Sequence, residues 1–197
     1  MSGKLGSAAA TGLLLWLGGA AAAVAFGALD ELPTRAPQAL LIGLVLAQVA
    51  AYASHRGFRA WADALDLRLL VGLHLTRYVG IWFLVLHGRG HLPYDFAVLG
   101  GWGDIVAACA ALLLLAFGQR LTPRSLPLVA WNVFGLIDIL FVVSRAVKNL
   151  NQDPSTMEPL TVLPLGLLPL WLVPLIISTH LLMLRRAFAP ASREVRA

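Results

Sequence analysis

Long apolar runs recur along the whole chain, and they constrain its fold more than any other feature of the sequence. Of the 197 residues, 59% are hydrophobic and only 13% are charged, whereas a soluble domain carries about 25% charged residues. Each run has about 20 residues, which is the length that a helix needs to cross the hydrocarbon core of a bilayer. The runs therefore predict an all-α integral membrane protein.

We predict a single transmembrane domain of six helices over residues 1–197, because a bilayer requires every backbone amide to be paired internally. The predicted spans are 8–28, 38–54, 67–87, 97–118, 127–147 and 160–184. An alternative concerns residues 1–25, where Ala23-Val24-Ala25 resembles the cleavage site of a signal peptide. The apolar stretch is longer than the core of a signal peptide, so an uncleaved first helix fits better.

The basic residues predict the orientation. One side of the six-span arrangement carries Lys4, Arg56, Arg59, Arg68, Arg120, Arg124, Arg185, Arg186, Arg193 and Arg196, and the other carries only Arg35, Arg89, Arg145 and Lys148. The positive-inside rule then places both termini in the cytoplasm of a bacterial cell, with the chain in the inner membrane. Because the net charge of +5 is clustered beside apolar spans, the expected partner is the lipid bilayer and not a nucleic acid.

The sequence offers no ligand set for a metal. Cys109 is the single cysteine, which excludes an intrachain disulfide and a thiolate cluster. His87 and His91 are four residues apart, but the glycines between them spoil a helical ligand pair. We therefore predict no metal site and no cofactor, apart from the haem hypothesis given below.

Three charged residues lie deep within the predicted spans, and they form the main candidate site. At about 1.5 Å per residue, Arg77, Asp138 and Asp104 lie roughly 15, 16 and 20 Å from the cytoplasmic edge. Unpaired charges at these depths are costly, so we predict that Arg77 lies between the two aspartates. The excess carboxylate would then favour a proton on one of them. The alternative is a structural triad that only fixes helix packing.

A second polar layer is predicted nearer the cytoplasm. His74 lies one turn below Arg77, and Asn132 and His180 fall at similar depths in the fifth and sixth spans. Together the layers would form a polar track or relay. His180 would alternatively reach the interface or cap the end of its helix.

Glycines and prolines mark the first and last spans. Gly12, Gly18, Gly19 and Gly27 in the first span are expected to allow close helix packing. Pro159, Pro164, Pro169 and Pro174 recur every five residues along the last span. Each proline removes a backbone hydrogen bond, so we expect either a curved helix or a partly unwound helix that lines a polar cavity.

Several stretches resemble small bacterial multi-span membrane proteins of no assigned function. They are Leu75 to Ile105, with Arg77, Leu92-Pro93 and Gly103-Asp104, together with Asn132 to Asp138 and Pro164 to His180. The resemblance covers about two thirds of the chain. It implies the fold class but brings no activity.

The leading functional hypothesis is proton-linked transport or permeation of a small solute. Six spans without an internal repeat are few for a transporter, so this hypothesis would require a homodimer. The alternatives are an intramembrane enzyme that acts on a lipid or isoprenoid, a b-type haem or quinone protein with His74 and His180 as axial ligands, and a non-catalytic assembly subunit. No nucleophile motif supports the enzyme.

Overall fold

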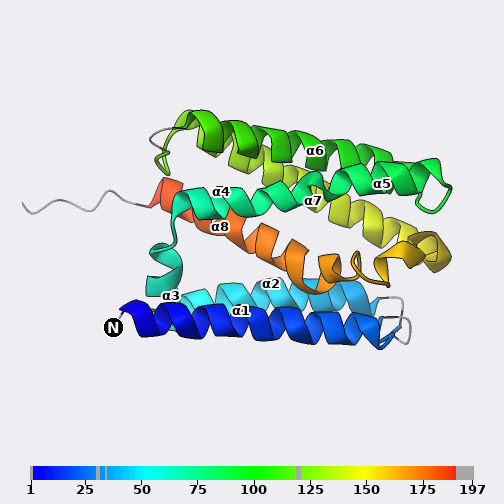
Figure 1. Cartoon of the computed structure of the whole chain (residues 1–197), viewed down its shortest axis with the longest axis horizontal. Helices are drawn as coiled ribbons and strands as arrows, with labels where there is room; N and C mark the ends of the chain where they lie inside the picture. Colours follow the sequence, from blue (N-terminus) through cyan, green and yellow to red (C-terminus); the bar gives the residue numbers. More distant parts are fainter. Residues whose placement is uncertain (1, 30–31, 34, 119–120, 190–197) are drawn as a thin grey trace, which may run out of the picture.

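The computed structural model describes residues 2–29, 32–33, 35–118 and 121–189, with side chains from residue 8 onward (Figure 1). Within these ranges all regular structure is helical and no strand is present. The basic residues Arg120, Arg193 and Arg196, and the side chain of Lys4, lie outside the described part of the chain.

Six helical segments are long and apolar enough to cross a membrane. They are α1 (Ser2–Ala25), α2 (Ala36–Ser54), the continuous segment α4 (Leu67–Leu73), η1 (His74–Tyr78) and α5 (Val79–Gly88), then α6 (Tyr94–Phe117), α7 (Leu126–Gln152), and η3 (Leu168–Leu172) continued by α8 (Val173–Phe188). Each overlaps one predicted span. The predicted all-helical class with six long apolar helices is confirmed.

The helices run along the long axis of the molecule and form two groups (Figure 1). The hairpin of α1 and α2 lies along one side, and α4, α5, α6 and α7 lie on the other, with α8 between them. We call α4 to α8 the bundle. Many large apolar side chains point outward, such as Leu46, Leu113 and Ile137, which are 60%, 57% and 63% exposed. An apolar surface of this extent suits contact with lipid.

A short helix between the second and third predicted spans joins the hairpin to the bundle. This helix is α3 (Arg56–Asp63). His55 caps its N-terminus, because the His55 side chain accepts a hydrogen bond from the Phe58 amide. Arginines nearby bind the carbonyls that helix ends leave free. Arg68 donates to the carbonyl of Leu115 near the end of α6.

The last span differs from the prediction of 160–184. The continuous helix begins only at Leu168, after the short 3₁₀ helix η2 (Pro154–Leu160) and a series of turns. Pro164 lies in the turns, and Pro169 lies in η3, which has π-helical hydrogen bonding. Because proline lacks an N–H, residues 160–167 do not continue the regular helix. Of the two predicted forms of the last span, a curved helix and a partly unwound helix, the second describes this end.

The expected packing role is wrong for Gly12, Gly18 and Gly19 of the first helix. A Cβ atom added at Gly12, Gly18 or Gly19 would meet nothing within 4 Å. The close approach lies instead between α5 and α6. A Cβ atom at Gly80 would overlap the carbonyl of Gly101, and one at Gly101 would lie 2.9 Å from the carbonyl oxygen of Gly80.

Candidate functional site

The third span changes its helical geometry at the point where it carries its polar residues. Between α4 and α5 the chain forms the 3₁₀ helix η1, from His74 to Tyr78. Side chains three residues apart are eclipsed in a 3₁₀ helix, so His74 and Arg77 project from one face. Both are fully buried, with exposed fractions of 0% and 1%.

Arg77 binds both aspartates and a backbone carbonyl through three different nitrogens. Nε donates to Oδ1 of Asp104 at 2.7 Å, Nη1 donates to the carbonyl oxygen of Gly135 at 3.0 Å, and Nη2 donates to Oδ2 of Asp138. The side chains of Asp104 and Asp138 are 4% and 10% exposed. The structure therefore brings Arg77, Asp104 and Asp138 together, and we call these three residues the Arg77 cluster.

Glycines make room for this cluster. A Cβ atom at Gly103 would overlap the Asp138 carboxylate, and one at Gly80 would lie 3.0 Å from Cβ of Asp104. Gly103 was noted from the sequence because it directly precedes Asp104, whereas Gly80 and Gly135 were not singled out. The available signal for Gly135 was its position three residues before Asp138.

The charges of the Arg77 cluster do not balance. One guanidinium faces two carboxyl groups, so the cluster carries one excess negative charge when both are ionised. An uncompensated charge is costly to bury, and a proton on either carboxyl group would make the cluster neutral. The arrangement can therefore hold one exchangeable proton without a change in its packing.

The second polar layer joins His74, Asn132 and His180, with Thr179 as an additional member. The ring centroids of His74 and His180 are 4.2 Å apart. Nδ1 of His180 lies 2.5 Å from Oδ1 of Asn132, while Nδ2 of Asn132 donates to the carbonyl oxygen of His180 at 3.1 Å. Nε2 of His74 lies 3.2 Å from Oγ1 of Thr179. We call these four residues the histidine layer.

The hydrogen bonds define which histidine nitrogens carry hydrogen in the neutral rings. A backbone carbonyl only accepts hydrogen bonds, so the Asn132 amide nitrogen must face the carbonyl oxygen of His180. The Asn132 amide oxygen then faces His180 Nδ1, and this nitrogen must donate. Thr179 donates its hydroxyl hydrogen to the Ile176 carbonyl at 2.9 Å and accepts from His74 Nε2. The other nitrogens, His180 Nε2 and His74 Nδ1, have no partner among the described residues. Each can accept a proton.

Trp131 encloses the histidine layer and was not singled out from the sequence. Its ring meets that of His74 edge-on, with centroids 5.0 Å apart, and its indole N–H donates to the carbonyl oxygen of Ala107 at 2.9 Å. Its position directly before Asn132 in an apolar span was the only signal. Trp131 excludes lipid from this side of the two histidines.

The haem hypothesis gains no support from the two histidines. Axial ligands of one haem face each other across the macrocycle, whereas the rings of His74 and His180 pack directly against each other. In this arrangement the two rings leave no space for a macrocycle between them.

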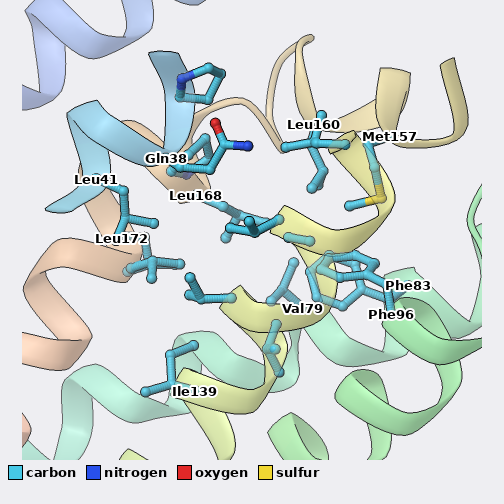
Figure 2. A pocket seen from close by; sticks show the side chains of 18 of the residues that line it. Gln38, Leu41, Val79, Phe83, Phe96, Ile139, Met157, Leu160, Leu168 and Leu172 are labelled. Atoms are coloured by element: carbon cyan, nitrogen blue, oxygen red, sulfur yellow. The ribbon is translucent and has the colours of Figure 1, made fainter. Parts of the chain in front are cut away.

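An apolar cavity of about 100 Å³ extends to the Arg77 cluster from the opposite side to the histidine layer. Its walls come from α2, α5, α6, α7, η2, η3 and α8, and Figure 2 shows Leu41, Phe83, Ile139 and Leu172 around it. Polar lining residues are Gln38, Arg77, Asp104 and Thr161, and all other lining residues are apolar. The proline series predicted a polar cavity beside the last span, whereas the cavity that this span lines is mostly apolar.

Comparisons with known proteins give one family. No curated protein and no solved structure shows a significant match to the chain. Residues 34–188, which include every residue of the Arg77 cluster and the histidine layer, match a family model described as a domain of unknown function, DUF8737. Because this match covers well over half of the chain, the protein belongs to the DUF8737 family.

Proposed function

We propose that the protein transfers protons, or a small solute together with a proton, across the bacterial inner membrane, with both of its termini in the cytoplasm. The observation that carries the proposal is the placement of Arg77 between two buried carboxyl groups, one of which can hold a proton. Intramembrane carboxylates with a basic partner are typical of proton relays and ion pathways.

The Arg77 cluster and the histidine layer adjoin each other at Gly135, which supports a pathway between them. A Cβ atom at Gly135 would lie 3.0 Å from His180 Nε2 and 3.2 Å from Arg77 Nη1. The missing side chain thus lets the acceptor nitrogen of His180 lie beside the guanidinium. In the proposal, Asp104 and Asp138 bind the proton, Arg77 supplies the counter-charge, and His180 and His74 relay the proton towards the cytoplasm.

The proposal is tested in vesicles that contain the purified protein and a pH-sensitive dye. A potassium diffusion potential drives protons inward, and the initial rate of acidification is compared with that of empty vesicles. We expect Asp138→Asn to remove the protein-dependent rate, because an amide cannot carry the proton. Asp95→Asn is the matched control, since Asp95 pairs with Lys148 at a half-exposed site outside the cluster. Wild-type vesicles no faster than empty ones would refute the proposal.

A second candidate is an intramembrane enzyme that acts on a lipid or isoprenoid. One observation favours it, which is that the apolar cavity ends at Asp104 and Arg77, an acid and a fixed cation. Its test is the lipid composition of cells with and without the protein. An enzyme predicts a shift that Asp104→Asn reverses, whereas proton transfer alone predicts no shift in lipid composition.

A further inference from the structure

We propose that the cavity above the Arg77 cluster is a binding site for a small neutral amphiphile from the membrane, with an apolar body and a hydroxyl head group. This goes beyond proton transfer, because it assigns a ligand to a space that the proposed pathway does not use. The inference rests on three features of the cavity. They are the side chains that form its walls, one polar side chain at one end, and the charged residues at the end formed by the Arg77 cluster.

The walls select an apolar body of limited size. They are built from aliphatic, aromatic, methionine and proline side chains of elements from α2 to α8. An engineered apolar cavity of about 150 Å³ in another protein binds benzene, so the present volume of about 100 Å³ limits the apolar body to a short alkyl segment or, at most, a single ring. A highly polar solute would lose its hydration against these walls without replacement.

Gln38 selects the head group. Figure 2 shows its amide at one end of the cavity. Its amide oxygen and nitrogen are both buried, and neither has a partner among the described residues. Two buried polar atoms without partners are costly, and a hydroxyl group satisfies both because it accepts one hydrogen bond and donates another. Gln38 therefore favours an alcohol or phenol over a pure hydrocarbon.

The end of the cavity at the Arg77 cluster argues against an anionic ligand. Among the described residues, Arg77 is the only cation that lines the cavity, and it already binds Asp104, Asp138 and Gly135. Two carboxyl groups at this position repel a third anion and leave no uncompensated positive charge to attract one. A neutral ligand fits this end of the cavity as well as its walls.

The test measures the binding of 4-fluorophenol and of fluorobenzene to the full-length protein in detergent micelles by fluorine NMR. Empty micelles of equal detergent concentration give the background. We expect 4-fluorophenol to bind wild-type protein, and Gln38→Leu to weaken it by at least about fivefold, since the loss of even one net hydrogen bond removes about 1 kcal/mol. Fluorobenzene, which lacks the hydroxyl group, should bind equally well to wild type and Gln38→Leu.

Two phenylalanine substitutions on α7 show whether the ligand occupies this cavity. Val143→Phe fills the cavity, because Val143 lines it, whereas Leu140→Phe adds the same ring at a position that is 51% exposed and outside it. We expect Val143→Phe to abolish binding of both probes and Leu140→Phe to preserve it. If Val143→Phe does not yield monodisperse protein, Leu172→Phe fills the same cavity from the segment leading into α8.

Equal binding to the filled and the control variant, or no effect of Gln38→Leu on 4-fluorophenol, would overturn the assignment. Binding is measured at equilibrium without a proton gradient. It therefore fails or succeeds independently of the vesicle assay for proton transfer.

Discussion

The α1–α2 hairpin and the bundle of α4 to α8 consist of similarly apolar helices, yet they use them differently. In the hairpin, only 11% and 6% of the residues in the apolar windows are buried, against 33% to 50% in the four segments of the bundle. The Arg77 cluster and the histidine layer lie entirely in the bundle. Apolar character therefore explains why a helix enters lipid. Whether a helix is also buried within this chain depends on its polar contacts and close-packed glycines at the interfaces with other helices.

The largest expected effect comes from removing the buried cation. Arg77→Gln would leave two buried carboxyl groups without their partner, and we expect it to lower the free energy of unfolding by about 3–5 kcal/mol. Arg35→Gln, at the exposed start of α2 in the hairpin, should change it by less than about 0.5 kcal/mol. The measurement is unfolding in mixed micelles followed by circular dichroism.

A rescue variant separates charge from packing in the Arg77 cluster. Adding Asp104→Asn and Asp138→Asn to Arg77→Gln removes the unpaired charges, so we expect it to recover most of the lost stability. If the triple variant is as unstable as Arg77→Gln alone, the guanidinium acts through its shape and not its charge.

The second expected effect compares a glycine whose Cβ position is blocked by neighbouring atoms with a glycine whose Cβ position is free. Gly80→Ala forces a methyl group against the Gly101 carbonyl, and we expect a loss of about 1–3 kcal/mol. Gly43→Ala, in the hairpin, meets nothing within 4 Å and should not destabilise the protein. Equal losses in the two variants would mean that the hairpin packs as closely as the bundle. Both are measured by the same unfolding assay.

The third comparison uses two indole hydrogen bonds of equal length. Trp131 donates to Ala107 O inside the bundle, and Trp16 donates from the hairpin to Leu170 O, each at 2.9 Å. Trp131→Phe should cost about 1–1.5 kcal/mol because it removes a hydrogen bond at a buried site, whereas Trp16→Phe should cost about 0.5 kcal/mol at its half-buried site. A larger loss for Trp16→Phe would show that the hairpin depends on this single contact.

The smallest expected effect concerns the ion pair that connects α3 to α8. Arg185 Nη1 lies 3.1 Å from Asp63 Oδ1, and both side chains are substantially exposed, at 50% and 36%. We expect Arg185→Gln to change the unfolding free energy by about 0.5 kcal/mol or less. A change comparable with that of Arg77→Gln would mean that the connection between the two regions, and not the buried cluster, limits stability.

Part of the candidate site could be predicted because charge is costly in lipid. The depths of Arg77, Asp104 and Asp138 along their spans were enough to predict that they meet. The other features of the site depended on backbone geometry, which cannot be obtained by counting residues along a span. The third span forms the 3₁₀ helix η1 in place of the expected α-helix at His74 and Arg77, and Gly103 and Gly135 admit side chains from neighbouring helices. Gln38 and the apolar cavity arise from helices that are distant in sequence.

The apolar runs alone specify six long helices, because each run is long enough to cross a bilayer and must pair its amides internally. The positions of the charges along these runs specify which side chains must find partners within the membrane. Tertiary packing places the hairpin at the periphery, starts the continuous helix of the last span at Leu168, and forms the cavity next to the Arg77 cluster. These features depend on which helix faces meet, and apolar faces of similar composition do not specify their neighbours until their side chains interlock.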